Sequence, residues 1–176
     1  MPETAQQYIQ RILGNLDGQE PLKVQQSTAK RLASLIKPLS KKQLTQRPAP
    51  DKWSIAEILA HLADAEVAGS WRMRLIIGNN GVPIQAFDQD AWADAFAYAK
   101  RDPAKSLEAF RALRENNLRM LKGLRQDLWE NYGMHEERGK ETITHMVRMF
   151  AGHDLNHLKQ VEEIAKAGRG KAKRAA

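Results

Sequence analysis

Prolines and glycines divide this sequence into blocks in which apolar residues recur at helical spacing, and no block shows the alternation typical of a strand. The blocks predict long helices over about residues 21–39, 55–77, 103–124 and 143–167, and shorter helices over about 3–13 and 90–98. Four long amphipathic helices without a sheet predict an all-α chain that folds as a four-helix bundle with short extra helices.

Capping residues mark where three of the long helices begin. Ser54 is followed three residues later by Glu57, which is the pattern of a capping box. Asp102 stands directly before a proline, and that order favours the start of a helix. Thr142 is placed to cap the last helix. The stretch "RPAPDKW" cannot continue a helix, so we expect a link between the first two long blocks there.

The charge of the chain is concentrated at one end. The formal net charge is +7, and four of the positive side chains lie in the final segment, 169–176. Glycines and basic residues without aromatic neighbours predict a flexible, basic tail over these residues, after a single domain over residues 1–168. Since the charge that remains on the folded part is small, we do not expect a nucleic-acid partner.

Several compartments and chemistries are disfavoured by composition. The chain contains no cysteine, which excludes disulfides, thiolate ligands and a cysteine nucleophile. No run of 18 apolar residues is long enough for a membrane span. The first residues, "MPETAQQYIQ", lack the basic and apolar regions of an export signal. We therefore expect a cytoplasmic protein with no membrane association.

Two histidines stand four residues apart in the last predicted helix, in the stretch "FAGHDLNHLKQVEEI". On a helical wheel, His153 and His157 fall toward the apolar face of that helix. Imidazoles four residues apart project side by side and can bind one metal ion, although packed histidines without a metal are the alternative. A third ligand would decide between the two, and His61 lies on the shoulder of its own helix, where the wheel does not require it to face the pair.

Other polar residues also fall on apolar faces. Glu66 is in line with the leucines of its helix, so its carboxylate is either paired in the core or faces a cavity. Arg114 and Asn117 indicate a polar pocket inside the bundle. Asp154 either orients a metal-binding imidazole or pairs with an arginine in the core, and we favour the first interpretation. Gln160 either lines the rim of the site or faces solvent.

The stretches "PAPDKWSIAEILAHLADAE" and "HDLNHLKQVEEI" together resemble the DinB and YfiT-like superfamily of small metal-binding four-helix proteins, over about residues 24–167. The resemblance implies an up-down-down-up bundle, a DinB-like domain over residues 1–168, and dimers in many members. The three metal histidines of the family fall on His61, His153 and His157. One departure is that Asp154 and Asn156 stand where some members have additional histidines.

The resemblance also implies an activity class. Members of the family include S-transferases that use bacillithiol, mycothiol or glutathione, a mycothiol-dependent maleylpyruvate isomerase, and many metal-dependent hydrolases. Three imidazoles leave a coordination position open on a divalent ion, with zinc or nickel as the metals we expect. The sequence therefore predicts a metal-dependent transferase or hydrolase acting on a small molecule, with a low-molecular-weight thiol as a candidate cofactor and Glu66 as a candidate catalytic residue. The alternative is a metal-binding or stress-related interaction protein without catalysis.

Overall fold

A computed structural model of the protein describes the backbone of residues 3–174 and the side chains of residues 3–168. The main elements are α1 (Ala5–Gly14), α2 (Pro21–Ile36), α3 (Lys41–Thr45), α4 (Ile55–Gly78), β1 (Val82–Ile84), α5 (Gln89–Ala95), α6 (Pro103–Lys122), β2 (Tyr132–His135), β3 (Gly139–Thr142) and α7 (Ile143–Arg174). Two short 3-10 helices cover Tyr98–Lys100 and Gln126–Glu130. No helix among the described residues is long and apolar enough to cross a membrane.

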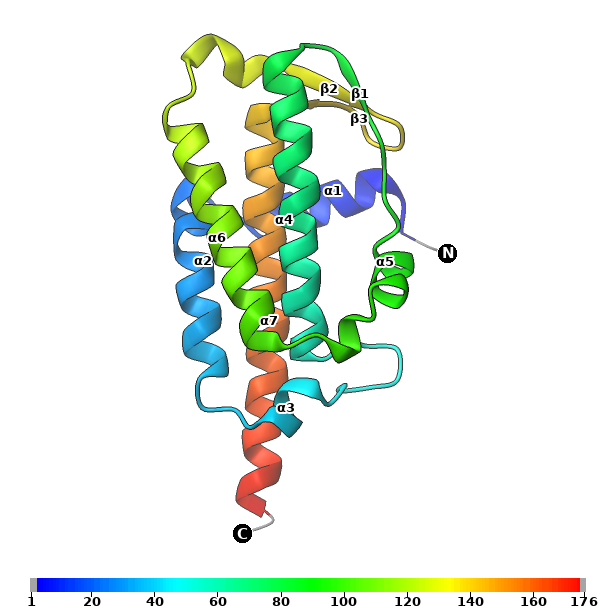
Figure 1. Ribbon diagram of the computed structural model, residues 1–176, viewed down its shortest axis with the longest axis vertical. Coiled ribbons are helices and arrows are strands. Elements are labelled where there is room, and N and C mark those ends of the chain that lie inside the picture. Colours follow the sequence, from blue (N-terminus) through cyan, green and yellow to red (C-terminus); the bar gives the residue numbers. More distant parts are fainter. Residues whose placement is uncertain (1–2, 175–176) are drawn as a thin grey trace.

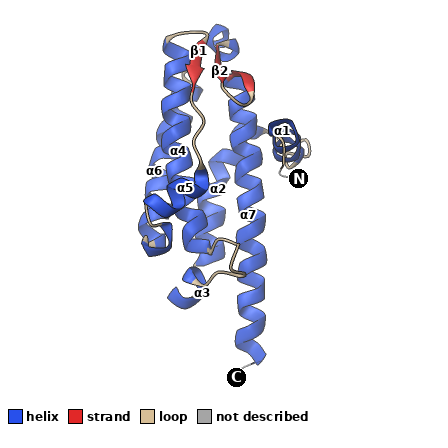
Figure 2. Ribbon diagram, turned by 90° about the vertical axis from the view of Figure 1, so that its right-hand side faces the viewer, coloured by secondary structure: helices blue, strands red, loops and turns tan. Residues whose placement is uncertain are grey.

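Helices α2, α4, α6 and α7 form a four-helix bundle (Figure 1). In that view α2 and α7 run down while α4 and α6 run up, which is the up-down-down-up order that the resemblance implies. Helix α4 packs mainly on α6, and α2 packs mainly on α7. The chain passes from the upper end of α4 to the lower end of α6 through β1 and α5, which explains how two consecutive long helices run in the same direction (Figures 1 and 2).

The predicted caps are confirmed. The Ser54 hydroxyl accepts from the backbone N–H of Glu57, and the Glu57 carboxylate accepts in return from the backbone N–H of Ser54. Asp102 accepts from two backbone N–H groups at the start of α6. The Thr142 hydroxyl accepts from the N–H of His145. Helix α2 ends at Ile36, three residues earlier than predicted, because Pro38 has no backbone N–H with which to continue the helical hydrogen bonds.

A small sheet at one end of the bundle was not predicted. Its order is β1-β2-β3, with β1 parallel to β2 and β2 antiparallel to β3. The strands are three or four residues long, too short to show alternation in the sequence. Gly133 permits close packing there, since a Cβ atom would lie 2.3 Å from the Ile84 side chain. The segment expected to be a turn is therefore a hairpin.

The apolar faces of the long helices meet in two main clusters. One surrounds Leu59, Leu62 and Phe110, and the other surrounds Met73, Ile76 and Val147, nearer the sheet. Helix α7 continues to Arg174, beyond the predicted end at Ala167, so the glycines do not interrupt its backbone. The side chains of residues 169–174 and all of residues 175–176 lie outside the described part, so the flexible basic tail stays a prediction.

Candidate metal centre

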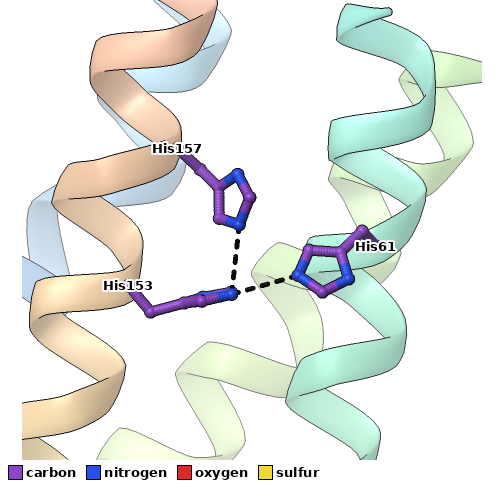
Figure 3. Close-up of side chains that lie close together, drawn as sticks. All are labelled: His61, His153 and His157. Carbon is purple, nitrogen blue, oxygen red and sulfur yellow. Dashed lines mark hydrogen bonds between the residues drawn. The ribbon is translucent and has the colours of Figure 1, made fainter. Parts of the chain in front are cut away.

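Three histidines from two helices converge at one point of the bundle (Figure 3). His61 comes from α4, and His153 and His157 come from successive turns of α7. The Nε2 atom of His153 lies 3.0 Å from Nε2 of His61 and 3.1 Å from Nε2 of His157. One nitrogen from each ring falls within 4.8 Å of the other two. The prediction that His61 comes within reach of the α7 pair is confirmed.

Two of the three rings are removed from water, and the third is half-buried. His61 and His157 retain 2 % and 6 % of their surface, and His153 is half-buried. Burial, followed by the charge of His157, lowers the pKa of His61 to about 3. Burial lowers the pKa of His157 to about 4 against the opposing effect of its hydrogen bond to Gln160. Burial also lowers the pKa of His153 well below its usual value. All three rings are therefore neutral near pH 7, the form in which imidazole binds a metal.

Hydrogen bonding alone does not satisfy this arrangement. The Nδ1 of His157 donates to Oε1 of Gln160 at 2.8 Å, which leaves a lone pair on its Nε2. His153 Nε2 carries either one proton or one lone pair, so it cannot form two full hydrogen bonds to its two neighbours at once. The Nδ1 of His61 is buried and has no hydrogen-bond partner among the described residues. Three Nε2 lone pairs directed at one ion would resolve the conflict between the converging ring nitrogens.

The donor set fits a divalent transition metal. Zinc–nitrogen bonds of about 2.0–2.1 Å place tetrahedral ligands about 3.3 Å apart, close to the two nitrogen separations that converge on His153. Three imidazoles leave at least one coordination position for a water molecule or a substrate. Such a set of three ligands differs from that of a closed, four-ligand structural site.

The rings are held in place by their neighbours. Gln160 lies one turn beyond His157 and fixes the orientation of that ring through its hydrogen bond, so the reading of Gln160 as a residue of the site is supported. The ring of Trp53, just before α4, packs against His61 with centroids 5.0 Å apart. No motif in the sequence indicates this contact of Trp53, so sequence reasoning missed it.

Asp154 does not orient a ligand imidazole, contrary to the reading favoured from the sequence. Its carboxylate is fully buried and accepts hydrogen bonds from the guanidinium of Arg114 and from the Thr28 hydroxyl at 2.8 Å. The side chain turns from the histidines toward α6 and α2, so the second reading, pairing with a core arginine, is the correct one.

Glu66 belongs to the same buried network. Its Oε2 accepts from Arg114 at 2.8 and 3.0 Å, and its Oε1 accepts from Asn117 at 2.8 Å. Of the two alternatives for Glu66, pairing in the core is the one observed. No hydrogen bond joins Glu66 to the three histidines in the described structure, so the polar residues predicted inside the bundle form a support beside the site.

Two cavities meet at the histidines. The first, which we call the Arg72 cavity, has a volume of about 570 Å³, and its walls include Tyr8, His61, Ala65, Arg72, Arg138 and His153. The second, the Trp53 cavity, has a volume of about 630 Å³, and its walls include Tyr8, Arg11, Trp53, His153, His157 and Gln160. His153 lies in both walls, so a small molecule can approach the open side of the site from either cavity.

With this geometry established, comparison with known proteins gives the family. The sequence model of the DinB superfamily matches residues 26–161. The chain belongs to the DinB superfamily. That span contains the whole of the three-histidine cluster.

Relatives within the family carry related names. A protein of Oceanobacillus iheyensis, "Putative metal-dependent hydrolase OB0782", is 25 % identical over 77 % of this chain and 78 % of its own length. "Putative metal-dependent hydrolase YfiT" of Bacillus subtilis is 20 % identical over 82 % of each chain. The solved structure of YfiT, described as a probable metal-dependent hydrolase with an unusual four-helix bundle topology, matches with a TM-score of 0.78 at 18 % identity, over 84 % of this chain and 85 % of that one. This likeness confirms the bundle fold.

Proposed function

We propose that this protein is a divalent-metal-dependent hydrolase that binds its metal through His61, His153 and His157. The observation that carries the proposal is the convergence of three neutral imidazole nitrogens on one point beside two cavities. The names of relatives in the same superfamily support the reaction class. Zinc or nickel is the metal we favour, because imidazole ligands suit both ions.

Several residues of this chain would have distinct roles in such a site. A divalent ion supplies Lewis acidity and makes a nucleophile available near neutral pH. His157, oriented by Gln160, presents a lone pair on Nε2, and Trp53 packs beside His61 and shields it from water. The half-buried face of His153 borders both cavities and leaves space for a substrate.

In our proposal the attacking group comes from outside the protein, and since the chain has no cysteine, a thiol would also have to be supplied by a small molecule. We propose water as that group, in keeping with the hydrolase names of the relatives. Transfer to a low-molecular-weight thiol is the second reaction that the same site can support. The substrate we propose is a small molecule, encountered in the cytoplasm, and assembly into a homodimer remains a prediction.

Activity tests should compare a panel of ester, amide and thiol-conjugation substrates after reconstitution with zinc or nickel. Turnover should disappear in His153→Ala and persist in His145→Ala, a matched variant on the same helix whose ring lies outside the cluster. Equal turnover in both variants would remove the histidine site from the reaction. Turnover that requires an added thiol would replace hydrolysis by transfer.

Glu66 is the sequence candidate for proton transfer, and we propose that it supports the core. Both its oxygens are already occupied by Arg114 and Asn117. Glu66→Gln keeps the shape of the side chain, so we expect it to lower stability while turnover of the folded fraction stays within about twofold of the wild type. A loss of turnover of a hundredfold or more, on the order expected for a general base, would restore Glu66 to the reaction.

A further inference from the structure

The far end of the Arg72 cavity contains a cationic side chain on the same helix face as His61. Arg72 follows His61 by eleven residues on α4, which places the two about 20° apart around the helix and about 16 Å apart along it. Ala65, between them, also lines the cavity and leaves room because its side chain is small. An extended molecule can therefore lie along this face of α4.

The guanidinium of Arg72 is held in place, but most of its N–H donors have no acceptor among the described residues. It donates to the carbonyl of Gln85 and lies over the ring of Phe87, 5.3 Å from the ring centroid. Within residues 3–168 it has no ion-pair partner and no other hydrogen-bond acceptor, although a guanidinium has five N–H donors. Burial, together with the charge of Arg138, lowers the pKa of Arg72, as expected for a cation that lacks a counter-ion.

A second arginine lines this cavity, and a buried histidine lies on strand β2. Arg138 lines it and is held by the carboxylate of Glu141 at 2.7 Å. His135 is buried on β2, and its Nδ1 accepts from two backbone N–H groups, so its proton is on Nε2, which has no partner among the described residues. His135 pairs in the sheet with Ile84. The next residue, Gln85, provides the carbonyl that accepts the hydrogen bond from Arg72.

The charges of three nearby carboxylates favour the protonated form of Arg72, but none of the three forms an ion pair with it in the described part of the chain. Glu136 accepts from the backbone N–H of Ala86, and Glu141 is paired with Arg138. Glu137 lines the cavity, and its carboxylate has no ion-pair partner in the described part of the chain. Its charge opposes any anion that enters, which makes it a useful position for a test.

We propose that Arg72, assisted by Arg138, forms an oxyanion subsite that binds the carboxylate or phosphate group of an extended small-molecule substrate. A guanidinium presents paired N–H donors that match the two oxygens of such a group. The subsite does not depend on the proposed function. Only one part of the proposal rests on it, namely that the reactive part of the substrate lies at the three histidines. An anionic group bound at Arg72 places the rest of the molecule along the Ala65 face toward His153.

Titration of the full-length protein with inorganic phosphate, and separately with acetate, followed by NMR, tests the subsite. The protein is treated with a chelator so that no ion at the histidines can bind the anion. We expect saturable binding of one or both anions, weakened about tenfold or more in Arg72→Gln and unchanged in Arg119→Gln, an exposed arginine of α6. Which anion binds more tightly distinguishes a phosphate substrate from a carboxylate substrate.

A second variant keeps the test independent of any effect of Arg72→Gln on folding. Glu137→Gln removes the opposing charge, so it should bind phosphate several-fold more tightly than the wild type. The subsite is contradicted if no saturable binding occurs in the chelator-treated protein, or if Arg72→Gln and Arg119→Gln bind alike. Binding that occurs only in the metal-loaded protein would contradict it too, because the anion would then be at the histidines. Loss of metal binding with intact anion binding would contradict the metal site alone.

Discussion

Arg114 is the side chain on which two buried carboxylates depend. It bonds both Glu66 and Asp154 with only 3 % of its side chain exposed, and the charges of those carboxylates outweigh burial to raise its pKa. Arg114→Met would leave two buried acids without a cation, which costs about 3–5 kcal/mol. Urea unfolding should show this loss, whereas Arg119→Met, exposed on the same helix, should change stability by less than about 0.5 kcal/mol. Equal stability of the two variants would contradict the network.

Glu57 gives the stability of the start of α4 a dependence on pH. Burial raises the pKa of its carboxyl, but hydrogen bonds from Arg47 and Ser54 outweigh burial and hold that pKa below its ordinary value of 4.5. A depressed pKa contributes stability that is present above the unfolded pKa and is lost as pH falls through the folded one. The wild type should therefore be more stable than Glu57→Gln near pH 7, and urea unfolding should show this gap narrow below about pH 4.5. A difference in stability between the two proteins that does not change with pH would contradict this role of the Glu57 carboxylate.

At the scale of the elements, the packing of α1 against α7 depends on a glycine of α7. A Cβ atom at Gly152 would lie 2.1 Å from the backbone oxygen of Ile12, so the two helices touch at this point. Gly152→Ala should displace α1, lower the free energy of unfolding by about 1–3 kcal/mol, and raise amide hydrogen exchange in α1. Gly168→Ala is the control on the same helix, because its Cβ would make ordinary contacts at 3.5 Å. Protection of α1 that is equal in both variants would contradict this packing.

The local or long-range origin of each element explains whether the sequence predicts it. Helices α4 and α6 begin at the residues that their caps predict, because a cap is a local signal read from three or four neighbouring residues. Strands β1 and β2 are separated by about fifty residues and are stabilised by pairing with each other, as Val82 with Gly133. Such short strands carry no periodic pattern, so no local rule identifies them.

At the scale of the whole molecule, the site depends on the order of the helices. The His153 and His157 pair is visible in the sequence, since one helix sets their spacing. His61 is 92 residues away from His153, and only the packing of α4 against α7 brings the two nitrogens together. The helical wheel places Asp154 and Glu66 inside the bundle but cannot identify Arg114 as their common partner, because that contact comes from a third helix.

Metal content tests the central claim most directly. The protein is purified without a histidine tag and analysed for bound elements beside the double variant His153→Ala, His157→Ala, with His145→Ala as the control on α7. We predict about one divalent transition-metal ion per chain in the wild type and in His145→Ala, and almost none in the double variant. Wild type without bound metal after reconstitution with zinc or nickel, or a double variant that retains as much metal as the wild type, would contradict the three-histidine site.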